Sequence, residues 1–252
     1  MHFIVGNNHF LQSQISSNFN KKAQEYQRYS QIQQQASFEL YFLVQKYFSS
    51  QLSSATKILD AGSGTSIIGK TWQFNSSSKI FEVDFSNSML ASWQDRPKNF
   101  IPVLADIYHL PFEANYFEFI TSSFVLQWLN NQALTSLNKV LKRNGLLAIA
   151  LPNNNSLQNL QNIMQVNQLP NHQQFLQQLL ANGFNITHHS WQNFSQTFVS
   201  LKEALHYFKN IGANTKTSQH NNFSHLLKQK NLWQKPIELD WQVSFFLAQK
   251  IS

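Results

Sequence analysis

The chain has 252 residues, of which 42% are hydrophobic and 12% are charged, and this length is sufficient for one large α/β domain with its own core. It contains no cysteine, which excludes disulfides, thiolate nucleophiles and cysteine-ligated zinc. No apolar run reaches the ~18–20 residues of a membrane span, and the first residues, MHFIVGNNHFLQSQ, lack the features of a signal peptide. We therefore expect a cytoplasmic protein that binds no membrane.

The formal net charge is +7, but the basic residues are scattered rather than gathered in a stripe, so a nucleic-acid partner is not indicated. A local excess of lysine does occur late in the chain, between Thr197 and Pro236, where the only acid is Glu203. Its members are Lys202, Lys209, Lys216, Lys228, Lys230 and Lys235. Two interpretations stay open: a solvated segment, or a surface on which an acidic partner docks.

Helical and strand patterns alternate along the first 152 residues. A helical segment over about 15–48 precedes short apolar runs that predict strands at 56–62, 79–84, 100–106, in the second half of 111–124, and at 145–152. Helices are predicted between them at 66–74, 86–94 and 131–143. Ser86 is the expected N-cap of the second of these helices, and Asn144-Gly145 the expected stop of the third, which gives Lys142 and Arg143 the role of helix C-terminal charges.

The pattern is looser after Pro152. It predicts a helix at 171–184 that ends at Gly183, a strand at 185–194, a helix at 200–214 and a closing strand at 237–250. Buried strands alternating with helices predict a doubly wound, seven-stranded, mostly parallel sheet with an antiparallel edge. We expect a single domain over 1–252, with an N-terminal helical cap (15–50), a cofactor-binding core (56–196), a basic helical insertion (197–236) and a closing strand (237–250).

Three acidic residues follow three consecutive predicted strands: Asp60, Asp84 and Asp106. Ligands of open α/β sheets bind at the carboxyl ends of the strands. Gly62 and Gly64 follow the first strand and allow a ligand to approach the backbone closely. Asp84 lies 24 positions after Asp60, a distance typical of a carboxylate that accepts ribose hydroxyls.

The glycine pattern argues against a dinucleotide, because Ile67 stands where the third glycine of that motif belongs. An acid at Asp60 suits a cationic amino-acid group better than a phosphate. Asp106 and the backbone of Ile107 are placed to read the edge of an adenine. Each acid taken singly could be only a helix cap or a loop residue, but together they indicate a nucleoside with a cationic amino-acid tail, which describes S-adenosylmethionine.

The motifs LDAGSGTS, VDFSNSML, LADIYHLPF and GLLAIALP resemble those of the class I S-adenosylmethionine-dependent methyltransferases. SSFVLQWLNN, ALHYFKNIGANT and WQVSFFLAQ narrow the resemblance to the malonyl-acyl carrier protein O-methyltransferases of biotin synthesis. The family commonly has cysteine where this chain has Ser63, and glycine where it has Ser66. Serine is tolerated at the second position only if positive φ is not required there.

The resemblance implies a Rossmann-like fold and a cofactor site. Asp60, Gly62 and Gly64 would line the methionine moiety, Asp84 the ribose, and Met89, Asp106 and Ile107 the adenine, while Ser123 and Phe124 would sit beside the transferred methyl. Gln127 and Trp128 would supply hydrogen bonds or a wall at the substrate pocket, and Tyr26 would close over the cofactor. Met89 and Tyr26 have plain core packing as an alternative role.

The reaction that this resemblance implies esterifies the free carboxylate of a malonyl thioester carried by an acidic acyl carrier protein. A carboxylate is ionised at neutral pH, so no general base is needed. Accordingly, we expect structural roles for His109, His188 and His189, and no metal site. The lysine-rich segment, with Lys202, Lys209 and Lys216, would be the docking surface.

Several alternatives stay open. Malonyl-coenzyme A could replace the carrier-bound substrate. The chain could instead methylate a quinone precursor or a free carboxylic acid, or it could be an inactive methyltransferase-like binding subunit.

Overall fold

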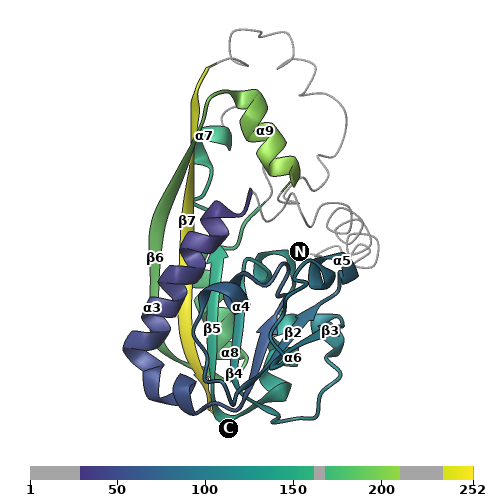
Figure 1. The fold of residues 1–252 in the computed structure, drawn as a ribbon. Helices are drawn as coiled ribbons and strands as arrows, with labels where there is room; N and C mark the ends of the chain where they lie inside the picture. The colour runs from purple at the N-terminus through teal and green to yellow at the C-terminus, as the bar shows by residue number, and fades with distance from the viewer. Residues whose placement is uncertain (1–28, 162–167, 211–234, 252) are drawn as a thin grey trace.

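The computed structural model describes residues 29–161, 168–210 and 235–251 (Figure 1). Tyr26, Lys216 and most of the lysine-rich segment lie outside the described residues, and so does the first half of the predicted helical cap. The side chain of Lys209 is likewise not described. None of the described helices combines the length and apolar character needed to cross a membrane.

Seven strands form one sheet in the order β3-β2-β1-β4-β5-β7-β6. They are β1 (Lys57–Ala61), β2 (Lys79–Asp84), β3 (Phe100–Leu104), β4 (Phe117–Ser123), β5 (Leu141–Pro152), β6 (Phe184–Phe198) and β7 (Ile237–Lys250). The first five are parallel, whereas β7 pairs antiparallel with both β5 and β6. This confirms the predicted doubly wound sheet and its antiparallel edge.

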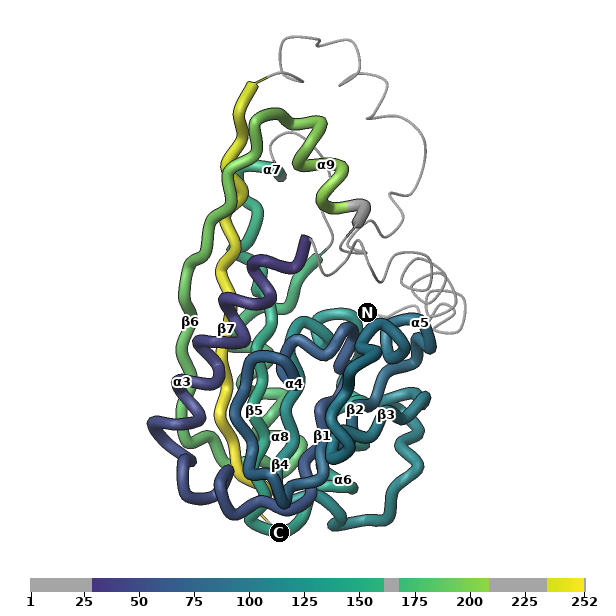
Figure 2. Tube along the Cα trace, viewed as in Figure 1, coloured from purple at the N-terminus to yellow at the C-terminus, as the bar shows by residue number. Residues whose placement is uncertain are grey.

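Helices cover both faces of the sheet (Figure 2). They are α3 (Gln31–Ser54), α4 (Ile67–Thr71), α5 (Asn87–Ala91), α6 (Gln132–Val140), α7 (Gln158–Gln161), α8 (His172–Ala181) and α9 (Leu201–Asn210), with 3-10 turns η1 (Ile107–His109) and η2 (Leu126–Trp128). One core cluster joins α3, α4 and α9 to the sheet. The second joins α6 and α8 to the opposite face.

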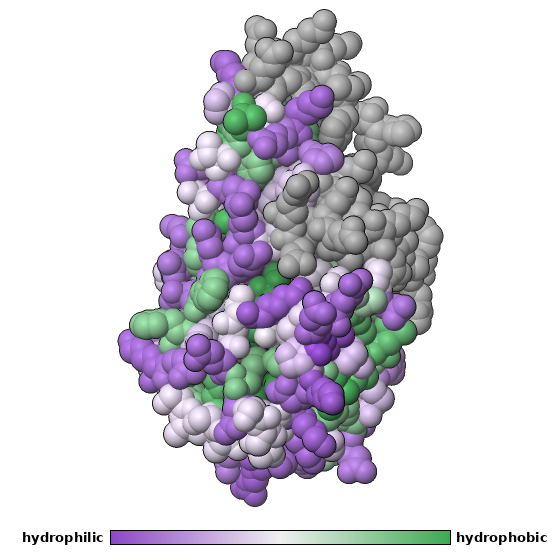
Figure 3. Space-filling model, viewed as in Figure 1, coloured by the Kyte–Doolittle hydropathy of each residue, from purple (hydrophilic) through white to green (hydrophobic). Residues whose placement is uncertain are grey.

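The antiparallel pair of β6 and β7 extends beyond the other strands, and α7 and α9 lie against this extension (Figure 1). The predicted helix at 200–214 is therefore confirmed over the part that the structure describes. The surface in Figure 3 is largely hydrophilic with separate hydrophobic patches. The exposed aromatic side chains include Phe38 and Phe42, one helical turn apart on α3.

The predicted helix at 131–143 extends too far. The sequence places Lys142 and Arg143 at the end of a helix, but α6 ends at Val140 and both residues belong to β5. The pairing of β4 with β5 shifts register between Phe117 and Phe119, and Asn144 has a φ of 60°. The Asn-Gly pair therefore bends the strand instead of capping the helix, and the Lys142 ammonium pairs with the Glu118 carboxylate.

Candidate functional site

The carboxyl ends of β1, β2 and β3 lie side by side, because these strands are neighbours and parallel. Asp60 is in β1, one residue before its end, and Asp84 ends β2, while Asp106 follows β3 by two residues. The topology therefore brings the three predicted acids to one edge of the sheet. The roles proposed for them remain predictions.

The loop after β1 is held against β2 by backbone hydrogen bonds. The N–H groups of Gly62 and Ser63 both donate to the Val83 carbonyl, at 2.8 and 2.9 Å. Gly62 has a φ of 77° and Gly64 a φ of 54°, so both occupy the left-handed region that favours glycine. A Cβ on Gly62 would lie 2.4 Å from Val125 Cγ2, whereas a Cβ on Gly64 would enter open space. The loop is thus packed at Gly62 and open at Gly64, where a ligand can approach the backbone.

Asp84 is the residue that ties this loop to β2. Its Oδ2 accepts from the Gly64 N–H at 2.9 Å, and its Oδ1 accepts from the Ser86 N–H at 2.8 Å. Burial raises the pKa of the carboxyl to about 6, against the lowering effect of the hydrogen bonds from Ser86, Gly64 and Phe85. The carboxylate is therefore fixed in one orientation with lone pairs left for further donors.

Asp60 is buried, with 2% of its surface exposed. Its Oδ2 has no hydrogen-bond partner among the described residues. Burial, followed by the nearby charges of Glu82 and Asp84, raises the pKa of the Asp60 carboxyl well above its usual range. A cationic group bound at this point would offset that unfavourable charge. A buried carboxylate with an acceptor oxygen left free by the described residues fits the cationic amino-acid end of S-adenosylmethionine.

The residues predicted to contact adenine have clear structural roles as well. Met89 is buried in α5, and its N–H donates to the Ser86 hydroxyl, which confirms Ser86 as the N-cap of this helix. Asp106 caps η1, since its Oδ1 accepts from the Tyr108 N–H at 3.0 Å. Ile107 is buried at the start of that turn. Core packing and capping account for their positions.

The segment after β4 carries the remaining predicted residues. Ser123 ends the strand, and Phe124 has a φ of 58°, which is an outlier for a bulky side chain. Backbone strain of this kind persists where the surroundings enforce it, and it clusters at functional sites. Gln127 and Trp128 lie in η2, and the Gln127 Oε1 is buried without a partner among the described residues.

A buried ion pair beneath the glycine loop was not predicted. The Glu82 carboxylate, fully buried in β2, pairs with Arg96 Nε at 2.6 Å, and Arg96 Nη2 donates to the Leu90 carbonyl at the end of α5. In the glycine loop itself, Lys70 Nζ donates to the Thr65 carbonyl at 2.8 Å. The carboxylate of Glu82 in the interior of the strand KIFEVD was the only sequence signal, since such a group needs a partner when it is buried.

Replacing Arg96 with methionine is expected to lower the free energy of unfolding by about 2–3 kcal/mol, because Glu82 stays buried without its partner. The cost is limited because burial already raises the pKa of Glu82, so the carboxyl can take up a proton. Urea unfolding would measure the loss, with the exposed neighbour Lys98 changed to methionine as the control. Equal stability of the two variants would argue against this role.

Ser66 has a φ of 64° and is fully buried, so its position does use the left-handed backbone in which the related family has glycine. The Ser66 hydroxyl makes no hydrogen bond of ordinary geometry with any described residue. It nevertheless lies close enough to Glu82 to lower the pKa of that carboxyl. The departure noted in the sequence therefore carries backbone strain.

Replacing Ser66 with glycine is expected to raise the free energy of unfolding by about 1 kcal/mol, since serine in this region costs roughly that amount. Asn144, at a φ of 60°, provides a matched control. Asparagine tolerates this region better, so Asn144→Gly should gain less in the same thermal unfolding assay. A loss of stability in Ser66→Gly would show that the contact with Glu82 outweighs the strain.

Comparison with known proteins identifies a methyltransferase domain over residues 59–149. A malonyl-[acyl-carrier protein] O-methyltransferase of Buchnera aphidicola is 28% identical over 228 residues, covering 87% of each chain. Four further relatives with the same description are 27–29% identical. A ubiquinone/menaquinone biosynthesis C-methyltransferase of Neisseria meningitidis is 32% identical, but over only 39% of this chain and 43% of its own length.

The fold has counterparts among solved structures. A Bacillus halodurans protein described as a candidate methyltransferase matches with a TM-score of 0.61 at 15% identity, covering 84% of this chain and 99% of its own. The Haemonchus contortus phosphoethanolamine N-methyltransferase 2, solved with S-adenosyl-L-methionine, matches with a TM-score of 0.52 at 15% identity, covering 85% of this chain and 52% of its own. The chain thus contains a methyltransferase domain with the class I fold, and its relatives described as O-methyltransferases support an S-adenosylmethionine-dependent O-methyltransferase.

Proposed function

We propose that this protein transfers the methyl group of S-adenosylmethionine to the free carboxylate of a malonyl thioester held by an acyl carrier protein. We place the reaction in the cytoplasm, early in biotin synthesis. The observation that carries the proposal is the extent of the similarity to malonyl-acyl carrier protein O-methyltransferases, which reaches 87% of both chains. The similarity to the quinone methyltransferase covers only 39% of this chain. The similarity over the rest of the chain therefore favours the malonyl substrate.

The cofactor would be held by residues of the first three strands. Asp60 would receive its cationic amino-acid group, the carboxylate of Asp84 would accept the ribose hydroxyls, and the backbone at Gly64 would allow close approach. Bound there, S-adenosylmethionine supplies an electrophilic methyl on a sulfonium. The carboxylate oxygen of the substrate forms the new bond to that methyl while the carbon–sulfur bond breaks and its electron pair stays on sulfur. No proton moves.

The protein contributes position and exclusion of water rather than acid–base chemistry. The Phe124 N–H donates a hydrogen bond of 2.8 Å to the Ala150 carbonyl, which fixes the residue after β4. Its side chain would form the wall beside the methyl. His109 fits this interpretation, since its side chain is 78% exposed. His188 stacks on Tyr47 of α3, with 4.7 Å between ring centroids, and His189 contacts His172 at 3.1 Å. These contacts agree with structural roles for His188 and His189.

Carrier docking would involve the lysine-rich end of the molecule. Lys202 in α9 and Lys235, just before β7, are both exposed, and acyl carrier proteins are strongly acidic. Changing Lys202 and Lys209 to glutamate should therefore slow methyl transfer to the carrier-bound substrate at low salt, because complementary charge mainly raises the association rate. The same reversal at exposed Lys79, which begins β2 and so lies at the amino ends of the parallel strands, is the control.

The proposed function is tested by methyl transfer from labelled S-adenosylmethionine to malonyl-carrier protein, malonyl-coenzyme A, free dicarboxylic acids and a quinone precursor. Preference for the carrier-bound malonyl group supports the proposal, and preference for a free acid or quinone would replace it. Failure to bind S-adenosylmethionine by calorimetry would instead indicate an inactive binding subunit. Complementation of a biotin-requiring strain that lacks the methyltransferase tests the pathway.

A further inference from the structure

Trp241 carries a buried hydrogen-bond donor that meets no acceptor in the described part of the chain. The residue lies in β7, its side chain is almost fully buried at 4% exposure, and its indole Nε1 has no hydrogen-bond partner among the described residues. Tryptophan N–H groups find a partner when they are buried, and each exception calls for an explanation. The nitrogen itself is buried, so its acceptor has to be a group that reaches it inside the core.

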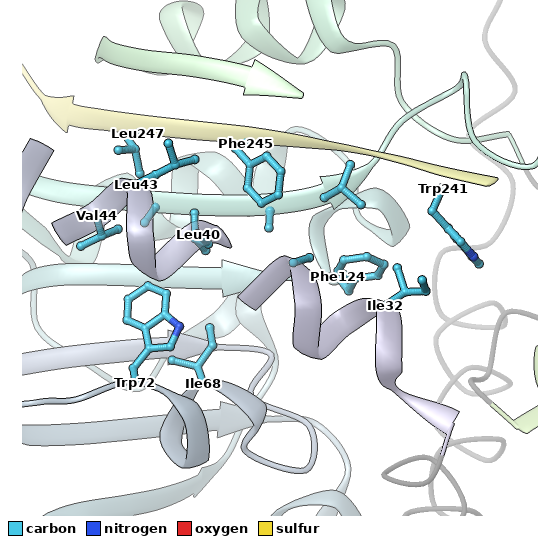
Figure 4. Close-up of a cluster of buried hydrophobic side chains, with 14 of the residues drawn as sticks. Ile32, Leu40, Leu43, Val44, Ile68, Trp72, Phe124, Trp241, Phe245 and Leu247 are labelled. Carbon is cyan, nitrogen blue, oxygen red and sulfur yellow. The ribbon is translucent and has the colours of Figure 1, made fainter. Parts of the chain in front are cut away.

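The position of Trp241 is next to the segment that follows β4. Its ring centroid lies 6.4 Å from that of Phe124 and 6.0 Å from that of Phe208 in α9. Figure 4 shows the three side chains of Trp241, Phe124 and Ile32 at one end of the core cluster, on the same side of β7. Strand β7 pairs with β5 through Val243 and Pro152, so Trp241 stands beyond the carboxyl end of β5.

Trp72 shows what a structural tryptophan of the same cluster looks like. It is buried to the same degree, at 5% exposure, and belongs to the same core. Its Nε1 donates to both the carbonyl and the hydroxyl of Ser37, each at 3.0 Å. Within this cluster, the described part of the chain therefore satisfies one buried indole and offers no acceptor to the other, beside Phe124.

We propose that the Trp241 N–H donates a hydrogen bond to an oxygen of the acyl group that is methylated, and so helps to determine substrate specificity. This rests on the proposed function. The aromatic surroundings exclude water, which strengthens a bond from an N–H to a charged acceptor. The carboxylate oxygen that does not receive the methyl is the strongest acceptor of the substrate. Donation there would hold the other oxygen toward the cofactor.

The test compares Trp241→Phe with Trp72→Phe, which removes the paired N–H of the same core. Trp241→Phe should lower kcat/KM for the malonyl-carrier protein by about tenfold or more, while its midpoint of thermal unfolding and its affinity for S-adenosylmethionine stay near those of the parent. Trp72→Phe should show the reverse, with a lowered midpoint and an unchanged kcat/KM once the folded fraction is matched. A parental kcat/KM in Trp241→Phe would overturn the inference.

The acceptor in the substrate could be an oxygen of the malonyl carboxylate or the thioester carbonyl oxygen. The product, the methyl ester on the carrier, distinguishes the two. If Trp241→Phe weakens binding of the malonyl form but not of the ester, the N–H binds the carboxylate; equal weakening of both points to the thioester carbonyl. The ¹⁵N–¹H signal of the Trp241 indole should also shift when substrate is added, and an unmoved signal would contradict the contact. Inactivity of the parent toward malonyl-carrier protein would refute the proposed function itself, independently of either variant.

Discussion

Asp84→Asn is expected to weaken binding of S-adenosylmethionine by at least about 100-fold, because two hydrogen bonds to a charged group contribute about 1.5–3 kcal/mol each. The carboxylate also organises the loop, since its two oxygens accept from the N–H groups of Gly64 and Ser86. An asparagine has only one oxygen, so its NH₂ group would face one of these donors. Isothermal titration of the cofactor measures the loss.

Asp95→Asn is the matched control. Asp95 is exposed, so its replacement removes the same charge without altering the loop. The control should bind the cofactor as the parent does. Near-parental affinity in Asp84→Asn would contradict the ribose role of Asp84.

The pH dependence of binding follows from the same carboxyl. Its pKa is about 6, raised by burial, and the ionised form is the one that accepts hydroxyl donors. Affinity for the cofactor should therefore rise about tenfold from pH 5 to pH 7 and then level off. Stability changes in the opposite direction in the free protein. Between about pH 4 and pH 6 the folded state binds the proton more tightly than the unfolded chain, so this contribution is lost as pH rises.

The pair Gly62→Ala and Gly64→Ala should separate folding from binding. Gly62→Ala is expected to lower the free energy of unfolding by about 3 kcal/mol, because the new Cβ would overlap Val125 Cγ2 at 2.4 Å on a left-handed backbone. Gly64→Ala meets no atom within 4 Å, so its cost is about 1 kcal/mol of backbone strain. Its Cβ occupies the space assigned to the cofactor, and affinity should fall at least about tenfold.

Denaturant unfolding and cofactor titration of both variants make this comparison. If Gly64→Ala bound S-adenosylmethionine normally, the cofactor would have to lie elsewhere along the edge of the sheet. If Gly62→Ala remained as stable as Gly64→Ala, the packing of Val125 against the loop would not limit this position.

The sequence alone determined the sheet and the placement of its acids. Strand β2 at 79–84 and strand β7 at 237–250 match their predicted bounds, because both segments are rich in β-branched and aromatic residues and 237–245 alternates hydrophobic with polar positions. Asp60, Asp84 and Asp106 could be grouped for the same reason, because parallel neighbouring strands end at one edge. Ser86 was found as a cap because its interaction is local, spanning three residues.

Only the tertiary structure decided the features that depend on distant partners. The strand position of Lys142 follows from pairing with β4, not from the helical pattern that precedes it. The strain at Ser66 and the ion pair of Glu82 with Arg96 arise where the loop, β2 and α5 pack together. Trp72 meets Ser37 across 35 positions of sequence, whereas Trp241 meets no acceptor among the described residues. Two identical residues thus differ because hydrogen bonds between remote segments are fixed by packing, which no local pattern encodes.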